Sequence, residues 1–249
     1  EALSPAQTIA AFDLKVIDEM MGDVKNPIKV IRDGIDSNIV HIYKDFHIGE
    51  FFDAATDTSH GVGRDFSVTT IMNVRTGEIV ADIMDNFLPP EELALHSVRM
   101  LEIFQSPLWF IESNDYGGVT ILTAQNLNYR NLGYEDDKRN KIGFNTQGSL
   151  AAGGKVIGTR AALWGSLMPA INNRQIQIYN IAGLKQFQDI VRNVQKQGRI
   201  EAMHGRHDDY PMAVGICWLK KDEVSGIGGS LKPLETLTFA GRSKLRRRW

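Results

Sequence analysis

The spacing of apolar residues along the chain alternates between helical and strand-like periods. Apolar positions recur every three or four residues at 7–21, 89–105, 119–128, 153–168, 182–194 and 211–221, which predicts helices, the first with Ser4 as its N-cap. Short β-branched and apolar runs predict strands at 38–45, 51–56, 66–74, 78–84, 108–111, 141–145 and 176–179. The turn-forming residues 75–77 predict an antiparallel meander from 51 to 84. Helices then alternate with strands, so we expect a mixed α/β sheet flanked by helices.

Acidic side chains follow two of the predicted strands and precede the last predicted helix. Asp57 comes directly after strand 51–56, Glu112 directly after strand 108–111, and Asp208 and Asp209 stand before helix 211–221. Open α/β sheets bind ligands beyond the carboxyl ends of their strands. Hard divalent cations prefer carboxylate oxygens, and an ion pair needs several carboxylates from different elements. These four residues are therefore candidates for a metal site, although Asp208 is also a suitable helix cap.

Composition and charge limit the classes of protein to consider. With 43% hydrophobic and 23% charged residues, the chain is typical of a globular domain, and its single cysteine, Cys217, excludes an internal disulfide. Residues 1–127 have a net charge of −12 and residues 128–249 one of +10. The basic half favours a polyanionic partner, and the alternative is that the two halves attract one another in the fold.

Other motifs narrow the chemistry further. The chain has no His-Glu-x-x-His sequence, no paired cysteines and no phosphate-binding loop, which argues against a zinc protease or a self-contained ATPase. No apolar run approaches the length of a membrane span, so we expect no membrane partner. His204 and His207 are possible ligands for Zn²⁺ or Mn²⁺. We expect Lys141, Lys155 and Arg160 to contact phosphates, together with the basic residues near the end of the chain.

Three segments together resemble a known family. Residues 51–80 (FFDAATDTSHGVGRDFSVTTIMNVRTGEIV) resemble the start of the nuclease domain of tailed-phage terminase large subunits. Residues 110–118 (FIESNDYGG) look like that family's second acidic motif, and residues 207–213 (HDDYPMA) look like its third, a double aspartate that opens a helix. The motifs occur in the family's order, and the similarity extends over roughly residues 38–220.

The resemblance implies both a fold and an activity. It implies an RNase H-like fold and a two-metal endonuclease that uses Mg²⁺ or Mn²⁺ to cut concatemeric double-stranded viral DNA during packaging. Asp57, Glu112 and Asp209 would be metal ligands and Asp208 a nearby helper. The implied partners are an N-terminal packaging ATPase domain absent from this chain, a portal protein and a small terminase subunit, and the implied location is the host cell cytoplasm.

The chain divides into three predicted parts. Residues 1–37 form a helical linker, residues 38–224 the nuclease domain, and residues 225–249 a Gly/Ser-rich and basic tail. Two alternatives remain open at this point. The chain could be a non-catalytic DNA or portal docking module of the same fold, or a nuclease that resembles Holliday-junction resolvases.

Overall fold

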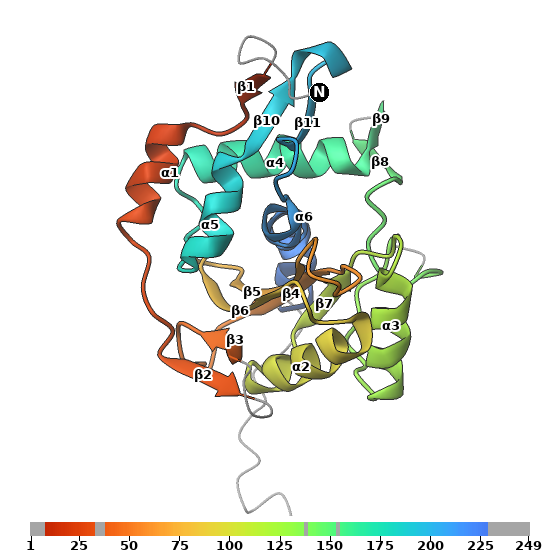
Figure 1. Cartoon of the computed structure of the whole chain (residues 1–249). Helices are drawn as coiled ribbons and strands as arrows, with labels where there is room; N and C mark the ends of the chain where they lie inside the picture. Colours follow the sequence, from red (N-terminus) through yellow and green to blue (C-terminus); the bar gives the residue numbers. More distant parts are fainter. Residues whose placement is uncertain (1–7, 33–37, 137–138, 153–154, 229–249) are drawn as a thin grey trace, which may run out of the picture.

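A six-stranded mixed sheet forms the centre of the protein. The computed structural model describes residues 8–32, 38–136, 139–152 and 155–228 (Figure 1). The strand order across the sheet is β2-β3-β6-β5-β4-β7. Its members are β2 (Lys29–Arg32), β3 (Asn38–Ile42), β4 (Phe52–Asp57), β5 (Ser67–Asn73), β6 (Ile79–Asp85) and β7 (Leu108–Ile111). The predicted meander is confirmed, because β4, β5 and β6 pair in antiparallel succession.

The last strand determines where the acidic residues lie. Strand β7 pairs with β4 in parallel, with Thr56 opposite Ile111, whereas the other neighbours in this sheet are antiparallel. Parallel neighbours end at the same edge of a sheet. The residues that follow β4 and β7, Asp57 and Glu112, are therefore brought side by side. The expected mixture of an antiparallel meander and a parallel strand is confirmed.

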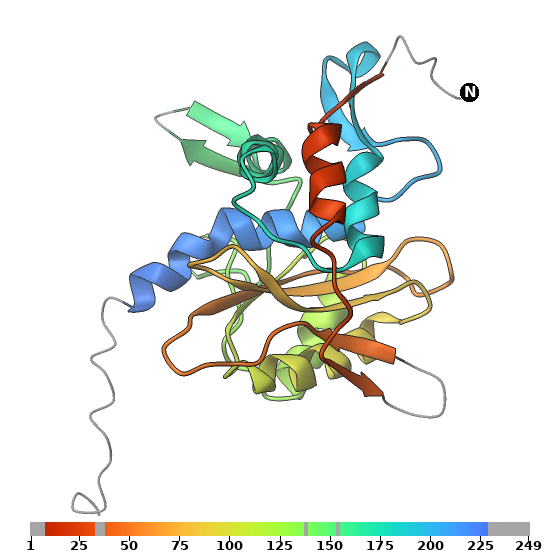
Figure 2. The ribbon, with the colours of Figure 1, turned by 90° about the vertical axis from the view of Figure 1, so that its left-hand side faces the viewer.

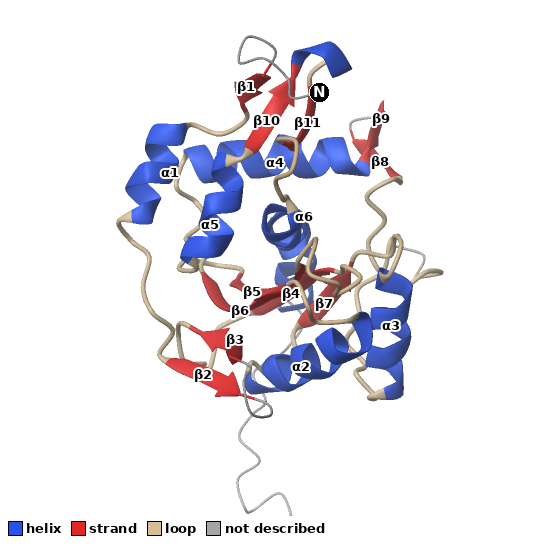
Figure 3. Cartoon of the chain, in the orientation of Figure 1, coloured by secondary structure: helices blue, strands red, loops and turns tan. Residues whose placement is uncertain are grey.

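Helices cover both faces of this sheet (Figure 2). Helices α2 (Pro90–Ile103) and α3 (Gly117–Asn126) lie on one face, and α6 (Asp209–Gly228) crosses β4 and β5 on the other. An outer layer of α1 (Leu14–Met21), α4 (Thr159–Asn172) and α5 (Ile181–Gln188) packs around α6 and against itself (Figure 3). Because both faces are covered, every residue of β5 is buried, including its polar Ser67, Thr69, Thr70 and Asn73.

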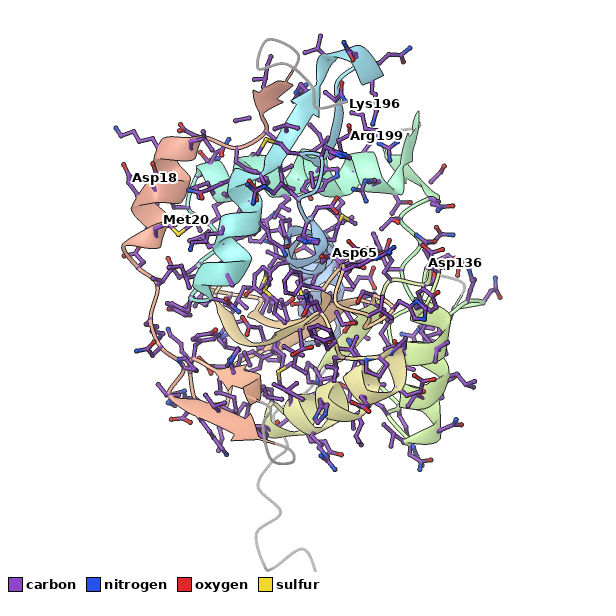
Figure 4. All side chains as sticks on the ribbon, viewed as in Figure 1. Asp18, Met20, Asp65, Asp136, Lys196 and Arg199 are labelled. Atoms are coloured by element: carbon purple, nitrogen blue, oxygen red, sulfur yellow. The ribbon has the colours of Figure 1, made fainter. Side chains whose placement is uncertain are left out.

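Two hydrophobic clusters lie on either side of the sheet. The cluster on the α6 face includes Phe110, Leu163, Trp164 and Phe187. It also contains residues of the N-terminal segment, namely Phe12, Ile17 and Met20, the last of which is labelled in Figure 4. The cluster on the α2 face includes Leu93, Trp109 and Tyr129. The segment predicted as a linker therefore contributes to the core.

Two smaller sheets lie outside the central one. Strands β1 (Thr8–Ala10), β10 (Ile190–Asn193) and β11 (Arg199–Ala202) form an antiparallel sheet, with the 3-10 turn η2 (Val194–Lys196) between the last two. Strands β8 (Ser149–Ala152) and β9 (Lys155–Gly158) form a hairpin ahead of α4. The sequence did not predict either of these sheets.

Several predicted boundaries are wrong, and local interactions explain the differences. The helix expected at 7–21 begins only at Leu14, because the Asp13 side chain caps it by accepting from the Lys15 backbone at 2.9 Å, while β1 pairs with β10. The proposed cap Ser4 lies outside the described residues. The helix expected at 153–168 begins at Thr159, because Lys155–Gly158 pairs as β9.

The second half of the chain shows two further differences. The helix expected at 182–194 ends at Gln188, because the strand Ile190–Asn193, which begins with two β-branched residues, pairs with β1 on one side and β11 on the other. Residues 176–179 form only one isolated bridge to the central sheet, and residues 141–145 likewise form bridges in place of a strand. Helix α6 continues to Gly228, four residues into the predicted tail, and residues 229–249 lie outside the described part. The three-part domain division stays a prediction.

Cys217, the single cysteine of the chain, is buried and free. Within the described residues, no helix is both long enough and apolar enough to cross a membrane.

Candidate metal centre

The ends of β4 and β7 place two carboxylates together. The Glu112 backbone N–H donates to the Thr56 carbonyl at 2.9 Å, which continues the parallel ladder to the end of β4. Asp57, the last residue of β4, is half-buried. Its carboxyl group lies within hydrogen-bonding reach of the Glu112 carboxyl group. The two acidic residues that the sequence placed at separate strand ends thus share one site.

Helix α6 brings the third and fourth acidic residues to the same edge. The Asp208 carbonyl accepts the first helical hydrogen bond from Met212 at 2.8 Å, so Asp208 occupies the N-cap position and Asp209 the first turn. The Asp209 Oδ2 atom accepts from the Phe66 backbone N–H at 3.0 Å, just before β5 begins. Since α6 crosses β4 and β5, its positive N-terminal end faces the acidic cluster and favours negative charge there.

The pKa values of Asp57 and Asp209 are raised because these carboxyl groups are buried close to one another. Burial raises the pKa of Asp57 well above its ordinary value, and the Glu112, Asp209 and Asp208 carboxylates raise it further in that order. Burial is also the main reason that the pKa of Asp209 rises to about 7, with Asp208 and Asp65 adding repulsion. Crowded carboxylates of this kind favour a bound cation, because positive charge relieves both repulsion and desolvation.

An arginine side chain contacts this cluster. The Arg160 guanidinium, at the start of α4, makes an ion pair with the Asp208 carboxylate and lies over the Trp164 ring. Its Nε atom is buried and has no hydrogen-bond partner among the described residues. This ion pair offsets the negative charge of Asp208. Asp57, Glu112 and Asp209 therefore remain as the carboxylates that repel one another most.

Polar side chains fix the orientation of Glu112. Its Oε1 atom accepts from Asn114 Nδ2 at 3.0 Å and from the Thr146 hydroxyl group. Asn114 and Thr146 are also hydrogen-bonded to each other at 2.5 Å. Thr146 is buried, whereas Glu112 and Asn114 are half-buried. Hydrogen-bonded carboxylates of fixed orientation are typical of metal ligands in proteins.

A histidine and a further aspartate adjoin the cluster. His207 Nδ1 lies 3.4 Å from Asp65 Oδ1 and 3.6 Å from Asp209 Oδ2. Together, the three side chains offer one ligand atom each, all within 4.8 Å of one another. The His207 Nδ1 atom is buried and makes no hydrogen bond within the described residues, and the ring packs edge-on against Phe66. Figure 4 labels Asp65 beside the start of α6.

The structure brings together most, but not all, of the residues that the sequence nominated. Asp57, Glu112, Asp208 and Asp209 converge, and Arg160 joins them through Asp208. Lys141 makes an ion pair with Glu135 at 2.8 Å, and Glu135 in turn accepts from Ser113, the neighbour of Glu112. The side chain of Lys155 lies outside the described part of the chain. Catalytic, metal-binding and DNA-binding roles for these residues stay predictions.

Three residues of the site were missed. One of them, Asn114, lies within the second resembling segment, two positions after Glu112. Asp65 lies in the turn-rich loop after Asp57, and its place within the first resembling segment was the available signal. Thr146 reaches Glu112 because Phe144 bridges to Glu112 at the end of β7, and nothing in the local sequence indicates that pairing. His207 was considered as a ligand, and its position beside Asp209 makes it a candidate. His204 is not among the three side chains of this group.

Comparisons with known proteins identify the fold. No protein-family model matches the chain, and no curated protein shows a significant match. Among solved structures, the large terminase nuclease of thermophilic phage G20c with bound magnesium is 12% identical, with a TM-score of 0.58 over 81% of this chain and 95% of that one. The large terminase nuclease domain of Thermus phage P74-26 is 15% identical, with a TM-score of 0.54 over 82% and 94%. The chain therefore has the RNase H-like fold of phage large terminase nuclease domains.

Proposed function

We propose that this chain is a metal-dependent DNA endonuclease domain. The observation that supports it best is the convergence of Asp57, Glu112 and Asp209 from three separate elements, with their charge largely uncompensated. The fold is that of nucleases that have been crystallised with magnesium or with cobalt. As these neighbours are 12–14% identical to the chain, they support the fold, and the site's own carboxylates support the activity.

The donor set fits hard divalent ions. Asp57, Glu112 and Asp209 offer carboxylate oxygens, which Mg²⁺ and Mn²⁺ prefer, and Asp65 and His207 adjoin them through Asp209. Two such ions, when bound, would activate an attacking water and neutralise the leaving oxygen of a phosphodiester. No nucleophilic side chain is required. Asp208, paired with Arg160, would help to orient Asp209 and balance charge.

The chain's own residues would then orient the substrate and the ligands. Thr146 and Asn114 hold the Glu112 carboxylate in one orientation, and the Phe66 N–H holds that of Asp209. Arg160 contacts the acidic cluster through Asp208, and Lys141 is linked to it through Glu135 and Ser113. Phosphate groups of a duplex would approach both cations. We include Lys155 among the proposed phosphate contacts on the basis of its charge and its place in the β8–β9 hairpin.

We propose concatemeric double-stranded viral DNA as the substrate and genome packaging in the host cytoplasm as the setting. The support is the fold likeness to phage large terminase nucleases together with the ordered acidic motifs. The proposed partners are a packaging ATPase domain, a portal protein and a small terminase subunit.

Cleavage of supercoiled plasmid by the purified chain tests this function. With Mn²⁺ or Mg²⁺ we expect nicked and then linear products, and none with a chelator. Asp57→Asn, Glu112→Gln and Asp209→Asn should each lower the rate more than about 100-fold, because losing a ligand costs more than losing a residue that orients one. The exposed Asp222, on the same helix as Asp209, provides the control Asp222→Asn, which should retain the wild-type rate.

Two outcomes would favour the alternatives. A docking module would leave plasmid intact with either ion. It would bind DNA in a salt-sensitive manner, and neither a chelator nor Asp57→Asn would change that binding. Selective cutting of four-way junctions over linear duplex would show a resolvase-like nuclease.

A further inference from the structure

A buried carboxylate lies on β6, outside the acidic cluster. Asp82 is fully buried, and both of its oxygens have polar neighbours. Oδ2 accepts from the Tyr210 hydroxyl at 2.7 Å and from Asn180 Nδ2 at 3.0 Å. Oδ1 lies 3.1 Å from His41 Nδ1 and 3.5 Å from the Tyr43 hydroxyl. Buried carboxylates are costly unless they are fully hydrogen-bonded, and this one satisfies that condition.

The strongest of these contacts leads directly to the metal centre. Tyr210 follows Asp208 and Asp209 in the first turn of α6. Its side chain is fully buried, and its hydroxyl group donates to Asp82 Oδ2 across the core. A displacement of Tyr210 would move the backbone of Asp209 with it.

Helix α5 holds the other side of Tyr210. The Tyr210 backbone N–H donates to Gln186 Oε1 at 2.8 Å. The Tyr210 ring lies against Gly183, where an added Cβ would come within 2.6 Å of three ring atoms. Asn180, the N-cap of α5, accepts from the Ala182 and Gly183 backbones while it donates to Asp82. The first turn of α6 is therefore fixed at its backbone, its ring and its hydroxyl group.

We propose that Asp82 and Tyr210 are positioning residues of the candidate metal centre, which set the place of Asp209 relative to Asp57 and Glu112. This inference rests on the proposed function, since it concerns the same metal ligands. Neither residue belongs to the acidic cluster. Metal ligands lose affinity when they shift by a fraction of an ångström, and residues that orient ligands typically contribute 10- to 100-fold to metal affinity.

Tyrosine-to-phenylalanine variants separate positioning from stability. Tyr210→Phe keeps the ring and removes only the donor to Asp82. Tyr179→Phe is a matched control, because the Tyr179 hydroxyl also donates to a carboxylate, Glu78, at 2.6 Å, and its ring is also buried. Tyr179 precedes α5 and its hydroxyl bond does not involve α6. Asp82→Asn is a second test that leaves the Tyr210 hydroxyl group intact.

The measurement is Mn²⁺ binding to the full chain, followed through the paramagnetic resonance signal of free Mn²⁺, with urea unfolding of the metal-free proteins alongside. We expect Tyr210→Phe and Asp82→Asn to raise the Mn²⁺ dissociation constant about tenfold. Tyr179→Phe should leave it unchanged. The Mn²⁺ concentration for half-maximal plasmid cleavage should rise in the same two variants.

The outcomes distinguish the inference from the function on which it rests. Wild-type Mn²⁺ affinity in both Tyr210→Phe and Asp82→Asn, in a wild type that binds Mn²⁺ and cuts DNA, would overturn the inference alone. Equal weakening by Tyr179→Phe would also overturn it, since the effect would then be one of general stability. A wild type that binds no Mn²⁺ would overturn the proposed function and this inference together.

Discussion

Replacing Asp209 by asparagine should stabilise the metal-free protein at pH 8 and abolish its stabilisation by metal. The pKa of Asp209 rises from 3.8 to about 7 in the folded protein, mainly because the side chain is buried. Because this pKa is higher in the folded than in the unfolded state, the protonated Asp209 contributes fully to the stability of the fold below about pH 4. That contribution is lost as the pH rises through about 7. Asparagine resembles the protonated acid, so the variant avoids this loss.

The magnitude follows from the size of the rise. A change from 3.8 to about 7 corresponds to an upper limit of about 4 kcal/mol. For a domain of this size, each kcal/mol changes the melting temperature by about 2–4 °C, so Asp209→Asn should melt about 10 °C higher at pH 8. Near pH 4 the two proteins should differ little. Mn²⁺ at pH 8 should raise the melting temperature of the wild type only.

Thermal unfolding followed by circular dichroism at pH 4 and pH 8, with chelator and with Mn²⁺, measures both effects. Asp222→Asn is the matched control on the same helix and should behave as the wild type. A difference between Asp209→Asn and wild type that is the same at both pH values would refute the electrostatic argument. So would a variant that is less stable than the wild type at pH 8 without metal.

Two further predictions concern the surroundings of Tyr210. The hydrogen bond to Asp82 raises the pKa of His41, so protonated His41 stabilises the fold below pH 6.5, and that contribution disappears as the pH rises. In urea unfolding, His41→Gln should therefore cost more at pH 5.5 than at pH 8.5, and an equal cost at both pH values would contradict this argument. Gly183→Ala should lower the free energy of unfolding by about 1–3 kcal/mol by overpacking the Tyr210 ring. Gly165→Ala, where an added Cβ meets nothing within 4 Å, should instead raise the free energy of unfolding by about 0.5–1 kcal/mol. Equal urea midpoints for these two variants would contradict the packing argument.

The part of the fold that could be predicted is the part that local periodicity determines. Strand β5 is continuous, β-branched and buried on both faces, and α2 opens on Pro90 with acidic residues in its first turn, so both were found close to their true bounds. Strands β1 and β10 are three and four residues long and depend on pairing with each other. Such strands have no periodicity of their own, and a helix was predicted over each.

The candidate site was predictable to the extent that chain position determines it. Asp57 and Glu112 follow strands that turned out to be parallel neighbours, which places them at one edge. Asp209 joins them because α6 crosses β4 and β5 on the face opposite α2. Only the family resemblance indicated that Asp209 belongs to the same site. The contact of Thr146 with Glu112 and the support of Tyr210 by Asp82 each join residues more than thirty positions apart, and such contacts follow from tertiary packing alone.

The order of the elements along the chain has a consequence for folding. Asp57 and Glu112 are in place once the central sheet forms, but Asp208 and Asp209 belong to α6, the last helix of the described chain. Docking of α6 on β4 and β5 joins residues about 150 positions apart, which is an entropically slow step. A partly folded chain without docked α6 therefore lacks Asp209 at the site, so the proposed metal centre is complete only after α6 has docked on the central sheet.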